Sequence, residues 1–284
     1  NPLMKIALAT CLEKPEGTFD DQLLKAALVK AGHTADFRVW NAAADWTAYD
    51  TCLIRSTWDY HRHLPKFLSW IHTISKHLRV MNPLDVVKWN SDKKYLCELG
   101  NNGVSVVPTK VFTSAEEAVK AIAKHVEDRR AVIKPTVSAT ADLTFKVDSG
   151  KDLDSLVKSI LARSALVLQP YVESIEEEGE LSLIYFKVAG KAKFTHAIAK
   201  RPKRGEFRVQ EDFGGSVEKV TPPDHCLAVA QRALDAIPHK WHYARVDLVD
   251  WKAKAQVGEL ELIEPELFFR LDRDSLDSMV QCLA

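Results

Sequence analysis

Residues 244–249 read ARVDLV and residues 257–266 read VGELELIEPE, and these two stretches decide the fold. Both have the composition of β-strands, yet each carries acidic residues where a strand normally places apolar ones. Two unit charges about 4 Å apart interact by roughly 4 kcal/mol at an effective dielectric near 20, so crowded carboxylates need a cation, a raised pKa or open solvent. A divalent metal that holds phosphates meets this need, because Mg²⁺ prefers one or two carboxylates together with phosphate oxygens. An exposed hairpin with one polar face is the alternative interpretation.

The composition is that of an ordinary soluble globular protein. The chain has 284 residues, enough for two domains or one elaborate α/β unit. Lys+Arg and Asp+Glu both total 39, and this balance gives no support for binding to nucleic acid or to a charged membrane surface. The five cysteines form no Cys-x-x-Cys pair, which argues against a zinc site or a disulfide framework and fits a reducing cytoplasm. No apolar run approaches the length of a transmembrane helix.

The N-terminal part has the pattern of a βαβ unit with a parallel sheet. Strands are expected at 5–10, 34–40 and 51–55, with a helix over about 20–31. The turn after the first strand holds a single glycine between residues 11 and 17, so the Gly-x-Gly-x-x-Gly turn of a dinucleotide-binding fold is missing. A nicotinamide-dependent enzyme is therefore not indicated.

The rest of the chain mixes helices and strands and predicts two further lobes. Helices are expected over 64–78, 91–101, 114–127, 152–163, 222–237 and 272–283. Strands are expected over 104–112, 131–134, 143–147, 166–169, 180–188, 193–200, 207–210, 244–249 and 257–263. The predicted organisation is an N-terminal α/β lobe over 1–90, a central α+β lobe over 91–172 and a C-terminal mixed lobe over 173–284.

Four features follow one another in a fixed order along the chain. Lys93 lies in Ser-Asp-Lys-Lys at 91–94, Lys134 ends a strand before proline, and Gln-Pro-Tyr-Val at 169–172 leads to Glu180. Asp247 and the Glu-Pro-Glu of 264–266 come last. This order resembles the ATP-grasp superfamily, in which two α+β lobes close on ATP behind an N-terminal α/β lobe. Arg-Ser-Thr-Trp-Asp-Tyr at 55–60 is similar to a signature of the carboxylate–amine ligases related to glutathione synthetase and to a cycloserine-forming ligase.

The resemblance implies an ATP- and Mg²⁺-dependent ligase acting on a small-molecule carboxylate and an amine. ATP would phosphorylate the carboxylate, and the amine would attack the resulting acyl phosphate, with release of ADP and phosphate. Such a step needs mainly positioning and charge neutralisation. A ring-closing, intramolecular version fits the same chemistry, and such ligases are commonly homodimers. The rival interpretations are a nucleotide-binding module that senses without chemistry, and a phosphotransferase on the same fold.

By resemblance, the nucleotide would lie between the central and C-terminal lobes. Lys93 and Lys134 would contact its phosphates as flexible point charges. The backbone of Gln169, Tyr171 and Val172 would read the adenine edge in an apolar slot. Glu180 would bind the ribose hydroxyls, with Glu173 or Glu178 as the alternative.

The remaining expected roles concern metal, catalysis and substrate. Asp247 and Glu264 are the leading expected Mg²⁺ ligands. Glu266 is a third expected ligand, at a position where the family usually has asparagine. Glu259 and Glu261 are expected to serve structure, with Glu261 as an alternative ligand. The expected catalytic cations are Arg208, Lys200 and Arg245, and the expected substrate contacts are Ser56, Thr57, Asp59, Tyr60 and Arg270. Residues 136–142 contain no glycine, although the corresponding loop is glycine-rich in many members of the family.

Overall fold

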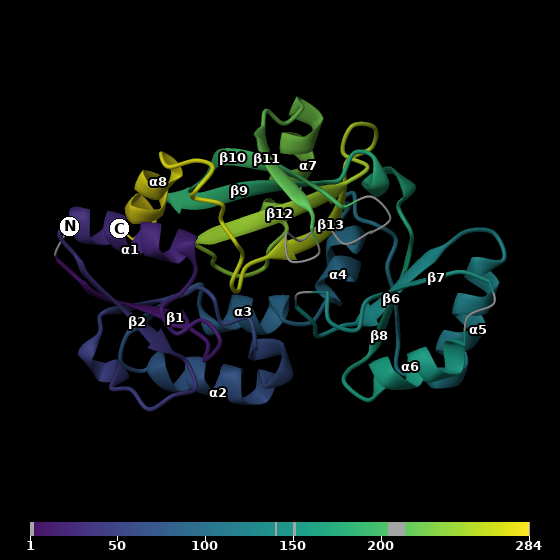
Figure 1. Ribbon diagram of the computed structural model, residues 1–284, viewed down its shortest axis with the longest axis horizontal. Helices are drawn as coiled ribbons and strands as arrows, with labels where there is room; N and C mark the ends of the chain where they lie inside the picture. Colours follow the sequence, from purple (N-terminus) through teal and green to yellow (C-terminus); the bar gives the residue numbers. More distant parts are fainter. Residues whose placement is uncertain (1–2, 140, 150–151, 204–213, 284) are drawn as a thin grey trace.

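Within residues 3–139, 141–149, 152–203 and 214–283, which the computed structural model describes, the strands form three sheets (Figure 1). Their strand orders are β2-β1-β3-β4, β5-β8-β6-β7 and β11-β10-β9-β12-β13. Each sheet lies within one of the three expected lobes, while the limits of the lobes stay a prediction. The expected mixed α/β and α+β fold class is confirmed.

The N-terminal sheet is parallel, as its βαβ pattern predicted. Its elements are β1 (Lys5–Thr10), α1 (Phe19–Lys30), β2 (Thr34–Val39), a 3₁₀ turn (Trp46–Ala48), β3 (Thr51–Ile54), a 3₁₀ turn (Tyr60–Arg62), α2 (Leu64–Ile74) and β4 (Arg79–Met81). Helix α1 begins with a capping box. The Thr18 side chain accepts a hydrogen bond from the Asp21 backbone N–H, and the Asp21 side chain accepts one from the Thr18 backbone N–H. The strand β4 was not expected, and α2 ends earlier than predicted.

The central sheet has helices on one face and the site on the other. Its elements are β5 (Lys110–Phe112), α5 (Ala115–Val126), β6 (Ala131–Pro135), β7 (Phe145–Val147), α6 (Leu153–Leu161) and β8 (Leu166–Pro170). Ala131 and Ile133 of β6 are fully buried with the residues of α5 and α6. Because side chains alternate along a strand, Val132 and Lys134 point to the opposite face. The strand expected over 104–112 is reduced to β5.

The helix expected over 91–101 begins later, at residue 95, and a short helix that was not expected precedes it. The two helices are α3 (Leu84–Asn90) and α4 (Tyr95–Asn101). The chain leaves the helical path between them because the Lys93 backbone N–H donates to the Thr136 carbonyl at 2.8 Å. Helix α4 packs on the C-terminal sheet, where Leu96 and Leu99 join its apolar core.

The C-terminal sheet is antiparallel. After a 3₁₀ turn (Glu173–Glu176), its elements are β9 (Glu180–Val188), β10 (Lys191–Arg201), β11 (Ser216–Val220), α7 (Asp224–Asp235), β12 (Tyr243–Val249), β13 (Gln256–Glu261) and α8 (Ser275–Cys282). The expected acidic hairpin is confirmed as β12 and β13. The strand expected over 207–210 lies outside the described residues. No helix in the described part of the chain is long and apolar enough to cross a membrane.

The N-terminal lobe and the C-terminal sheet share one core and two polar anchors. Residues of β1, α1, β9, β10 and α8 pack in the same apolar cluster. The fully buried Asn82 amide donates to the carbonyls of Tyr243 and Leu262, both at 2.8 Å. Arg55 Nε lies 3.1 Å from Asp21 Oδ1, and Arg55 Nη2 donates to the Pro265 carbonyl at 2.8 Å. The segment that follows β13 is therefore fixed to the N-terminal lobe.

The Arg55–Asp21 pair gives a stability prediction. Both side chains are almost fully buried, so Asp21→Ala leaves an uncompensated charge and is expected to lower the free energy of unfolding by about 3–5 kcal/mol. Glu218→Ala removes the exposed partner of Arg201 and is the matched control, with an expected change below about 1 kcal/mol. Urea denaturation of both variants measures the difference. If both variants lost the same free energy of unfolding, the buried charge of Arg55 would not need Asp21 as its partner.

Candidate active site

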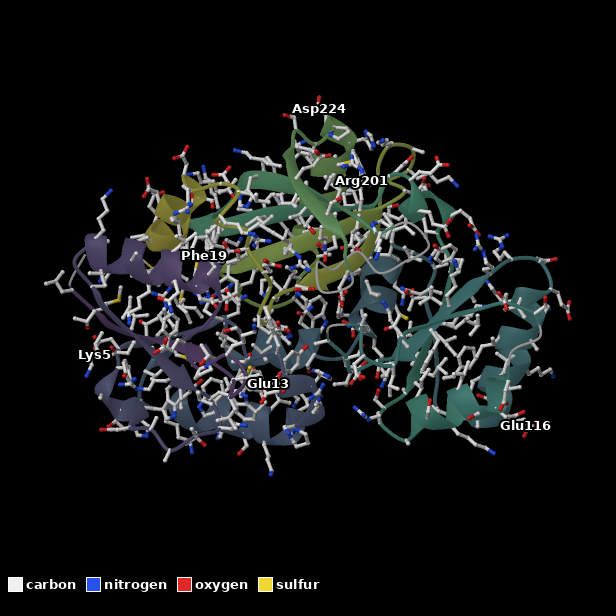
Figure 2. The ribbon with its side chains drawn as sticks, in the orientation of Figure 1. Lys5, Glu13, Phe19, Glu116, Arg201 and Asp224 are labelled. Carbon is white, nitrogen blue, oxygen red and sulfur yellow. The ribbon has the colours of Figure 1, made fainter. Side chains whose placement is uncertain are left out.

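A cavity of about 700 Å³, partly open to solvent, lies between the three sheets. Glu13 follows the carboxyl end of β1 and lies toward the middle of the molecule, whereas Glu116 of α5 lies at its periphery (Figure 2). The expected site residues that line this cavity are Asp59, Tyr60, Lys93, Lys134, Gln169, Tyr171, Val172, Glu180, Lys200, Arg245, Asp247, Glu264 and Glu266. Residues far apart in the sequence are thus brought to one cavity.

Strand register places charged side chains opposite one another on the cavity face of the C-terminal sheet. Directly opposed residues have Cβ atoms about 4.5–5.5 Å apart, within reach of hydrogen bonds and ion pairs. The opposed pairs are Asp247 with Glu259, Arg245 with Glu261, and Lys200 with Glu180. The neighbouring Ala244, Val246 and Leu248 point the other way, into the core. A regular strand alternation therefore builds the site.

Buried ion pairs connect these side chains. Arg245 Nη2 lies 2.9 Å from Asp247 Oδ2 and 2.6 Å from Glu261 Oε1. Lys200 lies 3.6 Å from Asp247 Oδ2 and also pairs with Glu180. Burial raises the pKa of Asp247, but the charges of Arg245 and Lys200 outweigh it and bring that pKa down to about 2. Asp247 is therefore an ionised carboxylate held in place by two cations.

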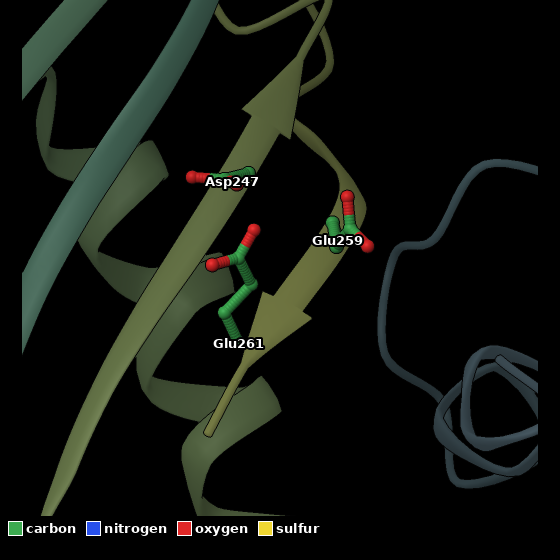
Figure 3. A group of neighbouring side chains, drawn as sticks. All are labelled: Asp247, Glu259 and Glu261. Atoms are coloured by element: carbon green, nitrogen blue, oxygen red, sulfur yellow. The ribbon is translucent and has the colours of Figure 1, made fainter. Parts of the chain in front are cut away.

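Asp247, Glu259 and Glu261 form an acidic group whose ligand atoms all lie within 4.8 Å of one another (Figure 3). Glu259 and Glu261 are two residues apart on β13, so both point to the cavity. Glu259 was expected to serve structure, whereas for Glu261 metal binding was the stated alternative. Glu264 and Glu266 follow the end of the strand and line the same cavity outside this group. Carboxylate oxygens at such spacing suit a hard divalent cation.

Two glutamates of the cavity are difficult to ionise. Burial raises the pKa of Glu261 to about 7; Arg245 opposes the shift, and the charges of Asp247 and Glu259 reinforce it. Burial and the charge of Glu261 raise the pKa of Glu264 well above its usual range. Added positive charge in the cavity would lower both pKa values.

Lys93 and Lys134 approach the acidic group from the other side of the cavity. Lys93 Nζ lies 2.7 Å from Glu259 Oε1 and donates to the Ser138 carbonyl at 3.0 Å. The Lys134 side chain makes no ion pair or hydrogen bond with another residue of the described ranges. Burial lowers the pKa of its ammonium group, and the charge of Glu259 opposes that shift. An ammonium group that faces a cavity outside any direct ion pair is suited to binding an anion.

The end of β8 forms an apolar slot. The Tyr171 backbone N–H donates to the Arg130 carbonyl at 2.9 Å, and its hydroxyl donates to Glu176 at 2.7 Å. Gln169 Nε2 donates to Thr109 Oγ1 at 3.0 Å. The apolar lining of the slot comprises Val107, Val132, Pro170, Val172, Ile175 and Val249. A flat aromatic base fits such a surface.

Glu180, one of three candidates for ribose binding, lines the cavity next to this slot. The other two candidates do not line it and have different partners. Glu173 pairs with Arg130, and Glu178 accepts from the Lys252 backbone at 3.3 Å.

Only some of the expected substrate contacts line the cavity. Asp59 lines the cavity, and its carboxylate accepts from Trp40 Nε1 at 2.8 Å. The hydroxyls of Ser56 and Thr57 are buried without a partner in the described ranges, and neither residue lines the large cavity. Arg270 also lies outside its lining and pairs with Asp20 at 2.7 Å and with Glu266. Arg208, an expected catalytic cation, lies outside the described residues.

Several cavity residues escaped the sequence reasoning. They are Glu13, Lys14, Arg62, Asn90, Tyr95 and Phe268. Glu13 and Lys14 follow the carboxyl end of β1, and ligands of α/β sheets bind at the carboxyl ends of parallel strands. That rule could have identified these two. The others depend on tertiary packing.

The cavity thus combines an apolar slot, a lysine outside any direct ion pair and an acidic group, as a ligase of the ATP-grasp class requires for ATP and a divalent cation. Residues 6–82 match the family described as the N-terminal domain of the D-cycloserine synthetase DcsG. The chain is 30% identical over 290 residues to the cycloserine biosynthesis protein DcsG of Streptomyces lavendulae, covering 94% of this chain and 93% of that protein.

Solved structures agree with this class. The crystal structure of D-cycloserine synthetase DcsG superposes with a TM-score of 0.86 at 27% identity, covering 98% of each chain. The ATP-grasp ligase PsnB, in complex with minimal precursor, Mg and ADP, shares the fold with a TM-score of 0.62 at 14% identity, covering 98% of each chain.

The chain therefore belongs to the DcsG family of ATP-grasp ligases, and it is an ADP-forming carbon–nitrogen ligase. The resemblance drawn from its motifs is confirmed.

Lys134 gives a binding prediction. Lys134→Met is expected to weaken binding of a non-hydrolysable ATP analogue by about tenfold to a hundredfold, since a hydrogen bond to a charged group contributes about 1.5–3 kcal/mol. The same change removes an unpaired, partly buried charge, so the melting temperature is expected not to fall. Calorimetric titration and thermal unfolding measure the two effects. Lys110→Met, at an exposed position of the same sheet, is the control; an equal loss of affinity there would contradict a specific role for Lys134.

Proposed function

We propose that this ligase closes a small ring by joining a carboxylate and an amine of the same amino-acid-derived substrate, with an acyl phosphate as the intermediate. The curated relative at 30% identity and the solved structure at 27% identity are both named for cycloserine. The observation that carries the proposal is that residues of the N-terminal lobe form one wall of the cavity. Trp58, Asp59 and Tyr60 supply that wall, and they lie in the segment matching the N-terminal domain of DcsG.

The proposed nucleotide orientation follows from the residues that line the cavity. Its adenine would occupy the slot at Tyr171 and Val172, and its ribose would reach Glu180. The phosphates would then meet Lys134 and Lys93, which lie at the acidic end. This direction also brings the γ-phosphate toward the wall formed by Trp58 and Asp59, where the substrate carboxylate would lie.

The acidic group fits Mg²⁺. Asp247 and Glu261 offer carboxylate oxygens, and Glu259 lies within the same 4.8 Å grouping. Glu264 is a further candidate ligand because it lines the cavity and has no hydrogen bond or ion pair within the described ranges. Glu266 is the least favoured ligand, since Arg270 already pairs with it. When bound, Mg²⁺ would neutralise charge on the phosphate oxygens.

The side chains of the site then act mainly by positioning and charge. A substrate carboxylate oxygen attacks the γ-phosphorus, the bond to ADP breaks, and Lys134 and Lys93 hold the negative oxygens. The substrate nitrogen next attacks the acyl carbon, loses a proton, and phosphate leaves. Lys200 and Arg245 lie beside Asp247 and would stabilise the oxyanion of the tetrahedral intermediate. Arg208 is proposed for the same role from its position in the sequence.

The rival functions make different products. A phosphotransferase would release a stable phosphorylated substrate, and a sensing module would bind ATP without turnover. Residues of the N-terminal lobe line the cavity together with Lys93 and Lys134, so a second substrate would lie beside the nucleotide, and this favours the ligase over a module that only binds ATP.

The reaction itself is the first test. Purified protein with ATP, Mg²⁺ and a panel of serine derivatives that carry a nitrogen nucleophile on the side chain is expected to release ADP and phosphate. Mass spectrometry should show a product lighter than its substrate by one water, without any added amine. A product that forms only when a separate amine is added would contradict ring closure. It would show that the enzyme joins two different molecules.

Metal dependence is the second test. EDTA is expected to abolish ADP release, and excess Mg²⁺ to restore it. Asp247→Asn should lower kcat by about a hundredfold or more and raise the Mg²⁺ concentration needed for half-maximal rate, because a charged ligand worth several kcal/mol is lost. Asp224→Asn, on the exposed start of α7, is the matched control. Unchanged Mg²⁺ dependence in a folded Asp247→Asn variant would remove Asp247 from the metal site.

A further inference from the structure

The segment that follows Lys134 is held by contacts from outside itself. The Thr136 carbonyl accepts from the Lys93 backbone at 2.8 Å, and the Ser138 carbonyl accepts from Lys93 Nζ at 3.0 Å. The Val137 backbone donates to Ser164 Oγ at 3.2 Å. Ser138, Ala139, Ala141 and Thr144 line the cavity in which the phosphates are proposed to lie. We call residues 136–139 and 141–144 the phosphate segment.

The phosphate segment also rests on the N-terminal lobe. Ala139 packs against the apolar core of that lobe. Asp142 Oδ2 lies 3.3 Å from His61 Nε2 and 3.2 Å from Arg163 Nη1. Asp142 therefore joins His61 of the N-terminal lobe to Arg163 of its own lobe.

His61 has a second contact, on the substrate side. Its side chain is 3% exposed, and its Nδ1 lies 3.0 Å from the Trp58 carbonyl oxygen. Trp58 and the two residues after it form one wall of the cavity. The imidazole thus stands between the wall and the phosphate segment, with one ring nitrogen directed at each.

The backbone around Asp142 requires such support. Ala141 and Leu143 have φ values of 57° and 52°, in the left-handed region that side-chain-bearing residues rarely adopt. Such conformations persist where surrounding contacts over-determine them. The segment contains no glycine that would make this geometry easy. The contacts of Asp142 on both sides are consistent with this need.

We infer that His61 is a positioning residue that couples the phosphate segment to the substrate wall and keeps the acyl phosphate away from water. Its coupling function rests on the proposed reaction, whereas the physical link between the two segments does not. His61 touches no reacting atom. Its loss would loosen the segment over the phosphates, and water would then compete with the substrate nitrogen for the acyl phosphate.

The link is tested first without any ligand. Hydrogen exchange of peptides covering residues 136–149 is expected to rise at least about threefold in Asp142→Ala and in His61→Ala, and no further in the double variant, because residues in direct contact are not additive. Glu173→Ala, which removes another exposed carboxylate of an ion pair with Arg130, is the control and should leave this region unchanged. The inference would be overturned if both single variants exchanged as slowly as the wild-type protein. It would also be overturned if the increases added in the double variant. Neither outcome depends on whether the protein ligates any substrate.

The coupling is tested next in turnover. With a substrate that the wild-type protein cyclises, Asp142→Ala is expected to release at least about threefold more ADP per product, with kcat for product lowered and the KM for ATP changed little. His61→Gln, which retains a donor, should recover part of the coupling lost in His61→Ala. An unchanged ratio of ADP to product in both Ala variants would overturn the role in shielding. Absence of any product from the wild-type protein would instead count against ring closure, and the exchange result would still decide the link.

Discussion

The structure depends on the requirement that buried carboxylates have cations beside them. Asp247 is almost fully buried, and it is ionised because Arg245 and Lys200 lie next to it. Removing one partner of such a pair typically costs about 3–5 kcal/mol, so each charge constrains the others. The register of β10, β9, β12 and β13 is what brings them together. A shift of one residue in any strand would place these charges in the apolar core.

The same requirement fixes the N-terminal lobe on the C-terminal sheet. Arg55 joins buried Asp21 to the Pro265 carbonyl, and Arg270 joins buried Asp20 to Glu266. These contacts hold the chain after β13, which carries Glu264 and Glu266 into the cavity. The parallel sheet thus contributes more than a substrate wall, because its helix α1 also orders the acidic end of the site.

The sequence predicted the elements better than their contacts. The acidic hairpin, the βαβ opening and the order of Lys93, Lys134 and the β8 slot could be read from local patterns. The orientation of Glu259 and Glu261 toward the cavity could not, because strand alternation shows which residues share a face and not which face meets the site. Arg270 donates to Asp20, and these residues are 250 positions apart in the sequence, so no local pattern could have predicted the pair. The break at Lys93 likewise depends on Thr136, which lies far along the chain in the same central lobe.

The central claim is that a substrate carboxylate is phosphorylated before the nitrogen attacks it, and an isotope measurement tests it most directly. Substrate labelled with ¹⁸O in both carboxylate oxygens would be converted with unlabelled ATP in unlabelled water. An acyl phosphate leaves one carboxylate oxygen on phosphate, so mass spectrometry is expected to find a single ¹⁸O in the inorganic phosphate and none in ADP. Unlabelled phosphate alongside a cyclised product would contradict the account.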